Sequence, residues 1–276
     1  MTSEHPDWLI VRRGEAPIIV SVPHAGVKLW AFEPRFVGPW LARKDADWRL
    51  EELYDFLDAL DATVVRTHLS RSIIDVNRDP SGASLYPGQA TTELCPATTF
   101  DGESLYRDGA APDEAEIASR RKLYFDPYHA AMAGEVARLR ERFARVALFD
   151  AHSIRSRIPR LFDGELPAFN LGTNSGASCS PALREAVGAV IAASGRSFVV
   201  DGRFKGGWIT RAYGRPSDGV EAMQLELACR AYMLEPEAPS PDNWPQPIDP
   251  GRAVRTRATL RKILQTILAH LERPAP

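Results

Sequence analysis

Val146-Ala-Leu-Phe-Asp-Ala-His-Ser-Ile-Arg155 runs from four apolar residues into an acid, a histidine and a polar end. The apolar run Val146–Phe149 predicts a strand that is covered on both faces. Asp150 and His152 are two residues apart, so on a strand their side chains point in the same direction. Because open α/β sheets bind ligands at the carboxyl ends of their strands, the stretch predicts a functional carboxylate and imidazole. A helix-capping aspartate and a surface histidine are the alternative interpretation.

Other apolar stretches also predict strands, and several of them end in polar residues. His24 follows the first of these strands, and Glu226 lies near the end of the last. Asn77 and Arg78 close the third. A glutamate buried between leucines is costly unless it is paired or used. The predicted strands are Pro17–Val22, Ala62–Thr67, Ser72–Pro80, Ser197–Val200 and Val220–Ala228, with a short strand or turn at Ala168–Thr173.

Helical periodicity alternates with these strands, which implies a mainly parallel sheet with crossover helices on both faces. The segment Pro80–Pro112 is rich in Gly, Pro, Ser and Thr and predicts a long functional loop. Phe204–Gly214 combines glycines, aromatics and cations, and we interpret it as a loop that closes over a ligand or as a glycine-rich hairpin. The predicted helices are Arg43–Leu57, Pro112–Phe143, Pro181–Ala193 and Ala253–Leu271.

The composition is that of an ordinary globular protein, with 44% hydrophobic and 25% charged residues in 276. No shift in composition marks a linker, so we expect one domain over residues 1–276. A formal net charge of −2 gives no basic footprint for nucleic acid. The three cysteines lack CxxC spacing, which argues against a disulfide framework and for a reducing compartment. Without a signal peptide or an apolar run of about 20 residues, we expect a cytoplasmic protein with no membrane partner.

Two histidines and several acids thus fall at the ends of predicted strands, where parallel strands converge. Two imidazoles with one carboxylate form the ligand set of a catalytic zinc site that keeps one position open for water. A further carboxylate, such as that of Glu226, can serve as a general base. The residues together therefore predict a catalytic metal site, although each histidine alone is as easily explained as structural.

The strand ends and loops carry several short motifs between about Ile18 and Met233. They are Ser21–Gly26, Asp47-Trp48 with Leu53–Phe56, Ser70–Arg78, Leu94–Pro96 through Phe100–Gly102, Phe149–Ser153, Lys205–Arg211 and Gln224–Leu227. In their order and spacing these motifs closely resemble the N-formylglutamate amidohydrolase family. The number of separate motifs makes the resemblance specific.

The resemblance implies an α/β fold: a three-layer α/β/α sandwich with a mainly parallel mixed sheet, like that of zinc exopeptidases related to the carboxypeptidases (phosphorylase/hydrolase-like). Carboxypeptidases present a histidine, an acidic ligand, an Asn-Arg pair, a second histidine and a glutamate base, and this chain has the same types in the same order. Val27 stands where those enzymes have their glutamate ligand. Asp47 is therefore the candidate acidic ligand, and Asp150 is its competitor.

The resemblance also implies hydrolysis of N-formyl-L-glutamate to formate and L-glutamate, the last step of one histidine degradation route. The cofactor would be Zn²⁺ or another divalent metal, held by His24, Asp47 and His152. Glu226 would accept a proton from the attacking water. Arg71 would steady the negative charge that develops on the formyl oxygen.

The substrate implied by the resemblance is a small N-formyl amino acid with two carboxylates. Asn77 with Arg78 would hold the α-carboxylate, and Arg155 and Arg211 are the candidates for the second carboxylate. Ala212 stands where the family has a histidine. A related amidohydrolase for another N-acyl or N-formyl amino acid is therefore one alternative, and a non-catalytic protein that binds a metal or a small acid is another.

Overall fold

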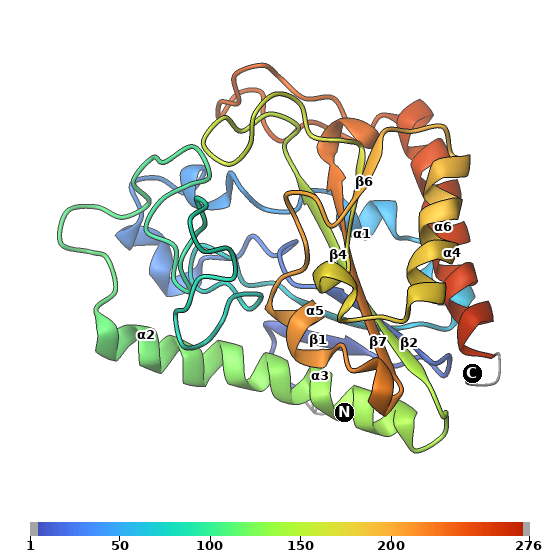
Figure 1. The fold of residues 1–276 in the computed structure, drawn as a ribbon. Coiled ribbons are helices and arrows are strands. Elements are labelled where there is room, and N and C mark those ends of the chain that lie inside the picture. The colour runs from blue at the N-terminus through green and yellow to red at the C-terminus, as the bar shows by residue number, and fades with distance from the viewer. Residues whose placement is uncertain (1–4, 273–276) are drawn as a thin grey trace.

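A single mixed sheet organises residues 5–272, the part of the chain that the computed structural model describes (Figure 1). Its strands are β1 (Leu9–Arg12), β2 (Ile18–Val22), β3 (Thr63–Thr67), β4 (Val146–Ile154), β5 (Phe169–Gly172), β6 (Phe198–Val200) and β7 (Val220–Ala228). They lie in the order β1-β3-β2-β4-β7-β5-β6. The central strands β3, β2, β4 and β7 are parallel, whereas β1 is antiparallel to β3 and β5 is antiparallel to β7.

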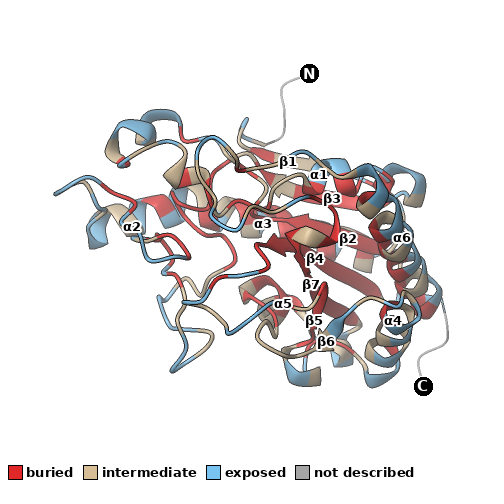
Figure 2. Ribbon diagram, turned by 90° about the horizontal axis from the view of Figure 1, so that it is seen from above, coloured by how far each residue is buried: buried red, intermediate tan, exposed pale blue. Residues whose placement is uncertain are grey.

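Helices cover both faces of the sheet. The α-helices are α1 (Leu50–Leu53), α2 (Glu114–Arg120), α3 (Asp126–Arg140), α4 (Pro181–Ala193), α5 (Trp208–Tyr213) and α6 (Pro250–Leu271). Helices α4 and α6 pack side by side on one face, and α3 lies with α5 on the other (Figures 1 and 2). The predicted three-layer α/β/α sandwich with a mainly parallel mixed sheet is therefore confirmed.

Short helical turns connect these elements. A π-helical turn at Arg121–Phe125 joins α2 directly to α3, so the segment predicted as a helix over Pro112–Phe143 is helical without interruption from Glu114 to Arg140. The 3-10 turns within the described residues are Trp30–Arg35, Leu41–Arg43, Leu57–Leu60, Asn174–Gly176, Pro216–Asp218 and Cys229–Ala231.

The alternating side chains of β4 divide the core into two halves. Phe149 belongs to one hydrophobic cluster with Leu183 of α4, whereas Leu148 on the opposite face packs in a second cluster with Tyr128 of α3. Every residue of β4 and β7 is buried (red in Figure 2). The strand predicted at Val146–Phe149 is therefore confirmed and extends further, to Ile154.

Helix α6 illustrates how local sequence and packing agree. Asp249 caps its first turn by accepting a hydrogen bond from the backbone N–H of Arg252 at 2.8 Å. Leu260, Leu264 and Ile267 follow at helical spacing and are fully buried. This apolar stripe packs against α4 and the sheet, which closes one side of the sandwich.

The segment Ser72–Pro80, predicted as a strand, is an irregular loop. Side chains and backbone groups of turns and other loops satisfy its backbone groups in place of a neighbouring strand. Arg120 donates to the carbonyl oxygen of Ile73 at 2.7 Å, and Asp75 accepts from the backbone N–H of Asn77 at 2.9 Å. The strand prediction is wrong because these contacts turn the chain, an effect that alternation of apolar residues does not reveal.

Two further predictions need correction. Arg43–Leu57, predicted as one helix, contains a single α-helical turn, α1, between two 3-10 turns, because Arg49 before α1 is in the left-handed region with a φ of 62°. Phe204–Gly214, interpreted as a ligand loop or a hairpin, contains the short helix α5 after its glycines. The sequence pattern also misses β1, a four-residue edge strand that is only partly buried.

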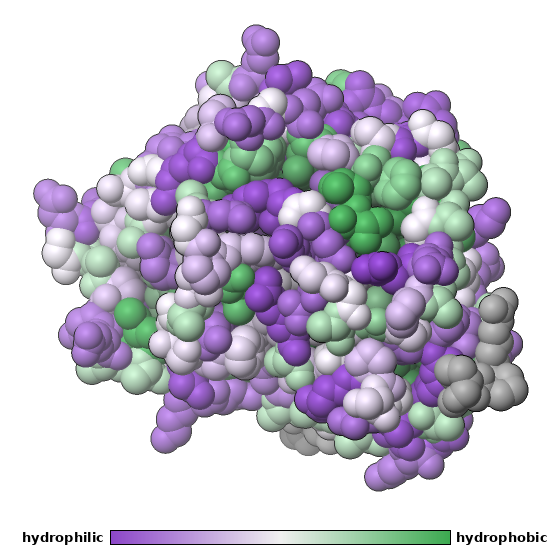
Figure 3. Space-filling view, in the orientation of Figure 1, coloured by the Kyte–Doolittle hydropathy of each residue, from purple (hydrophilic) through white to green (hydrophobic). Residues whose placement is uncertain are grey.

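The face of the molecule drawn in Figure 3 is mostly hydrophilic. On the face seen in Figure 3, hydrophobic residues form separate patches, mainly in the upper half of the view. Scattered apolar side chains of this kind are normal for folded proteins. No helix within residues 5–272 has both the length and the apolar character needed to cross a membrane. The exposed large apolar side chains include Trp30, Val37, Leu123, Phe198, Leu234 and Val254.

Leu264→Ala in α6 is expected to lower the free energy of unfolding by about 2–5 kcal/mol, because it leaves a cavity in the core. Val254→Ala on the same helix is expected to change this energy by less than about 0.5 kcal/mol, since Val254 is 64% exposed. Urea denaturation followed by circular dichroism measures both values. Equal losses in the two variants would contradict the burial pattern of α6.

Candidate active site

The parallel pairing of β4 with β7 brings four polar side chains to one face of the sheet. In the strand register Asp150 lies opposite Gln224, and His152 lies opposite Glu226. These positions alternate with apolar residues that pack toward α4 and α6. All four polar side chains are buried, near the carboxyl ends of the two strands. The polar site therefore lies on the same face of the sheet as the second hydrophobic cluster, nearer the carboxyl ends of the strands.

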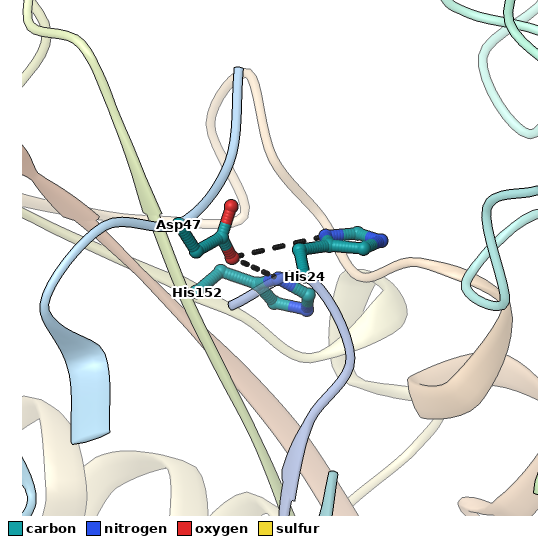
Figure 4. A group of neighbouring side chains, drawn as sticks. All are labelled: His24, Asp47 and His152. Atoms are coloured by element: carbon teal, nitrogen blue, oxygen red, sulfur yellow. Dashed lines mark hydrogen bonds and ion pairs between the residues drawn. The ribbon is translucent and has the colours of Figure 1, made fainter. Parts of the chain in front are cut away.

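His24 and Asp47 form a three-residue group with His152 (Figure 4). His24 follows β2, and Asp47 lies in the loop before α1. The Oδ2 atom of Asp47 lies 3.0 Å from Nδ1 of His152 and 3.7 Å from Nδ1 of His24. One candidate ligand atom from each residue lies within 4.8 Å of the other two. Such spacing fits three protein ligands around one metal ion.

Two further carboxylates hold the outer nitrogens of the imidazole rings. The Nε2 atom of His24 donates to Oδ1 of Asp75 at 2.7 Å, and Nε2 of His152 donates to Oδ2 of Asp150 at 2.8 Å. Carboxylate–histidine pairs of this kind fix the ring orientation of metal-binding histidines. Both Nδ1 atoms are thereby turned toward Asp47. Asp150 contacts the outer nitrogen of the His152 ring, whereas Oδ2 of Asp47 faces Nδ1 of both rings.

Two buried polar atoms of this group, Nδ1 of His24 and Oδ1 of Asp47, have no hydrogen-bond partner among the described residues. A buried polar atom without a partner costs about 1–3 kcal/mol. A divalent cation held between the three side chains would satisfy both atoms. An imidazole, imidazole and carboxylate set also matches the donors that zinc prefers. The residues therefore fit the metal ion that the sequence motifs imply.

The two histidines have different electrostatic surroundings. Burial lowers the pKa of His24, and the neighbouring Arg71 lowers it further. Burial also acts to lower the pKa of His152, but Asp150 and Asp47 outweigh it and raise this pKa well above its usual value. Each ring faces two carboxylates, Asp75 and Asp47 at His24 and Asp150 and Asp47 at His152, so the difference between the rings comes from the positive charge of Arg71 beside His24.

Glu226 lies beside this group and lines the adjoining pocket. Burial raises the pKa of its carboxyl group to about 8, although the nearby His152 opposes the shift. Gln224 donates to Oε2 of Glu226 at 3.4 Å. A carboxyl group with a raised pKa in a pocket is a candidate for proton transfer.

A pocket opens next to these residues, with about 580 Å³ of empty space when the adjoining open solvent is included. Arginines contribute much of its polar wall. Arg71 donates to Asp75 at 2.7 Å. Arg78 donates to the carbonyl oxygen and to Oγ1 of Thr92, each at 3.1 Å. Arg203 is a third arginine on the wall, so the pocket suits an anionic ligand.

Asn77 connects separate segments at the base of the pocket. Its Nδ2 donates to Oδ2 of Asp150 at 2.8 Å, and its Oδ1 accepts from the backbone N–H of Ile209 at 2.8 Å. A Cβ atom on Gly207 would lie 2.5 Å from the amide of Asn77, so a larger residue would displace this contact. Asn77 thus fixes the start of α5 relative to β4.

Arg155 and Arg211, the sequence candidates for a second substrate carboxylate, do not line this pocket. Arg155 forms ion pairs with Asp45 at 3.3 Å and with Asp101 at 2.7 Å. Arg211 donates to the carbonyl oxygen of Gly206 at 2.9 Å. Contact of either residue with a substrate stays a prediction. The structure brings the other predicted residues together around one site: His24, Asp47, His152, Glu226, Arg71, Asn77 and Arg78.

The sequence interpretation gives no role to Asp75, Gln224 or Arg203, although all three belong to the site or its pocket. Asp75 has a recognisable signal, because an aspartate two residues before Asn77 favours a turn. Gln224 shares a strand face with Glu226, two residues away. Arg203 has no such signal, since only the packing of distant loops brings it to the pocket.

An α/β/α sandwich that gathers two histidines, an aspartate and a buried glutamate at its strand ends has the fold and donor set of metallohydrolases. A family model described as N-formylglutamate amidohydrolase matches residues 16–233. The chain belongs to this family, as its motifs predict.

Curated relatives named N-formylglutamate deformylase are similar to nearly the whole chain. The Pseudomonas aeruginosa protein is 46% identical over 263 residues, which cover 95% of this chain and 96% of the relative. The Pseudomonas putida protein is 45% identical with the same coverage. A solved structure of N-formylglutamate amidohydrolase from Ralstonia eutropha has a TM-score of 0.77 at 21% identity, covering 96% of this chain and 99% of that one. This last similarity supports the fold.

His152→Ala is expected to abolish retention of zinc, because it removes one of the three protein ligands. The unaltered protein is expected to retain about one Zn²⁺ per chain after gel filtration. His68→Ala changes a histidine outside the group and serves as the matched control, with metal content unchanged. Elemental analysis of the filtered proteins measures the zinc content per chain. Full zinc content in the His152→Ala protein would exclude this group as the metal site.

Asp75→Asn is expected to weaken zinc binding by about 10–100-fold, because it removes the charge that orients His24. Asp113→Asn makes the same change at the first turn of α2, where the side chain only caps the helix, and is expected to leave the affinity unchanged. Competition with a chromophoric chelator measures both. The same zinc affinity in both variants would rule out the orienting role of Asp75.

Proposed function

We propose that this protein hydrolyses N-formyl-L-glutamate to formate and L-glutamate with the help of a divalent metal ion, Zn²⁺ by its donor set. The observation that carries the proposal is the register of β4 and β7, in which the buried carboxyl group of Glu226 lies beside His152 at an arginine-lined pocket. The shared name of the 46% and 45% identical relatives supports the substrate.

In this proposal His24, Asp47 and His152 hold the metal ion, and Asp75 and Asp150 orient the two rings. A divalent cation supplies Lewis acidity, which lowers the pKa of water and polarises a carbonyl group. The chain itself supplies a buried setting, since all five side chains are buried. Charges interact more strongly there than in bulk water.

Glu226 moves the proton. Its carboxylate accepts a proton from water as the water oxygen bonds to the formyl carbon, and it delivers this proton to the nitrogen as the C–N bond breaks. A pKa of about 8 makes this carboxylate a stronger base than an exposed glutamate. The hydrogen bond from Gln224 keeps the carboxyl group directed into the pocket.

Arg78 binds the α-carboxylate of the substrate. Its bonds to Thr92 fix the guanidinium at the pocket wall, and a planar fork of donors matches a carboxylate. Asn77 holds the preceding backbone in place through its bond to Asp150. Arg71, which is 3.7 Å from Asp47 and lines the pocket, stabilises the charge that develops on the formyl oxygen.

Two alternatives are less well supported. Ala212, the position that departs from the family motif, lies in α5, packs against the core and does not line the pocket. This substitution therefore gives no reason to expect a different N-acyl substrate. A non-catalytic binding protein has no need for a buried base such as Glu226. A cytoplasmic location, expected from the sequence, stays a prediction.

Glu226→Gln is expected to lower formate release from N-formyl-L-glutamate by about 10²–10⁴-fold with bound zinc unchanged, because an amide cannot accept the proton. Glu221→Gln is the matched control on the same strand. Glu221 lies on the opposite face and pairs with Arg145 at 2.6 Å, so this variant is expected to retain its turnover. A formate dehydrogenase-coupled assay on zinc-loaded proteins measures the rates.

Removal of zinc by a chelator is expected to stop formate release, and zinc addition is expected to restore it. Normal release by the stripped protein or by the Glu226→Gln protein would overturn the mechanism. A panel of N-formyl and N-acetyl amino acids tests the substrate. A higher kcat/KM for another member of the panel would overturn that part of the proposal.

A further inference from the structure

The proposed substrate carries two carboxylates, and the arginines on the pocket wall differ in how their charges are balanced. Arg71 pairs with Asp75 at 2.7 Å and with Asp47 at 3.7 Å. Arg78 lies 3.6 Å from Asp75. Among residues 5–272, no carboxylate forms an ion pair with Arg203. The pocket therefore contains one arginine whose charge has no acidic partner in the described chain.

Arg203 is held in place by neutral groups. Its Nε donates to the carbonyl oxygen of Leu161 at 2.8 Å, and its Nη2 donates to that of Ala90 at 2.7 Å. The guanidinium lies over the rings of Tyr86 and Phe204, 5.3 Å from each centroid. Its Nη1 has no acceptor within the described residues. The side chain is thus oriented while part of its donor capacity is unused.

The loop that carries Arg203 is itself anchored. Asp201 accepts hydrogen bonds from the backbone N–H of Thr173 at 2.7 Å and of Ser175 at 3.2 Å, which ties the loop to the end of β5. On the other side, Tyr86 accepts from the backbone N–H of Lys205 at 3.1 Å. A cation that is fixed before the ligand arrives loses less conformational entropy on binding.

The electrostatic surroundings of Arg203 also favour an anionic ligand. Burial lowers the pKa of its guanidinium, and Arg78 acts in the same direction, against the opposing effects of Tyr86 and Glu226. The cationic form is therefore less stable here than in solvent. A carboxylate placed between Arg203 and the rest of the pocket would compensate this cost through a charge-assisted hydrogen bond.

We propose that Arg203 binds the side-chain carboxylate of the substrate and so selects N-formyl amino acids with an acidic side chain. This inference rests on the proposed function and deepens it. Arg203 takes the role for which Arg155 and Arg211 are the sequence candidates, because it lines the pocket and they do not. The α-carboxylate stays with Arg78, so the two arginines bind the two ends of the amino acid.

The test compares N-formyl-L-glutamate with N-formyl-L-glutamine, which has the same shape without the charge. For Arg203→Gln, the ratio of kcat/KM for the two substrates is expected to fall by about 10–100-fold, the usual range for a lost charge-assisted hydrogen bond. The rate with N-formyl-L-glutamine is expected to change little. Because a ratio is independent of the fraction of active protein, partial misfolding of the variant does not affect it.

Matched variants separate charge recognition from structural support. Arg211→Gln is the control, since Arg211 also lies over the ring of Tyr86 and donates to a backbone carbonyl; it is expected to keep the ratio. Arg203→Lys retains the charge and is expected to keep part of the preference. The proposal would be overturned if Arg203→Gln lowered kcat/KM equally for both substrates. It would also be overturned if the ratio of the two kcat/KM values fell in Arg211→Gln or Arg155→Gln instead.

A binding measurement distinguishes failure of this inference from failure of the proposed function. If the unaltered protein releases formate from neither substrate, the proposed function fails. Calorimetric titration of the zinc-loaded protein with L-glutamate and L-glutamine then tests Arg203 by itself. Preferential binding of L-glutamate that disappears in Arg203→Gln supports the inference. Equal binding of the two amino acids, or binding of neither, overturns it.

Discussion

The parallel pairing of β4 with β7 is the constraint on which the rest of the site depends. Its register extends over all of both strands and sets His152 beside Glu226 and Asp150 beside Gln224. A shift by one residue would turn these side chains to the opposite face, into the apolar layer beneath α4 and α6. Because both strands are buried on both faces, the same packing that stabilises the fold also fixes the distance between the histidine and the glutamate.

Around this pair, several buried groups contact a partner of opposite sign. Asp75 contacts both His24 and Arg71. Burial alone would raise the pKa of its carboxyl group. The charges of Arg78, His24 and Arg71 outweigh this effect and hold the pKa well below its usual value. Removing one member would leave another charge buried and unpaired, which is strongly unfavourable. Asp75 therefore links His24, a candidate metal ligand, to Arg71 on the wall of the pocket.

Much of this arrangement could be predicted from the sequence, and the remainder has a common physical cause. Alternation along Val146–Ile154 places Asp150 and His152 on one face, and the motifs identify the family. The loop at Ser72–Pro80 could not be predicted, because side chains from other segments satisfy its backbone. Arg203 could not be predicted either, since its position depends on loops that are more than a hundred residues apart in the chain. Local periodicity describes strands and helices well, but it carries no information about such contacts.

The position of β7 has a consequence for how the protein is made. It is the last strand in the sequence, yet it lies between β4 and β5 in the middle of the sheet. While a nascent chain on the ribosome still lacks residues 220–228, β4 has an unpaired apolar edge of the kind that favours aggregation. Such a chain already contains His24, Asp47 and His152 but not Glu226, the residue proposed to move the proton. The edge of β4 that faces β7 can therefore be covered only after residues 220–228 have been synthesised.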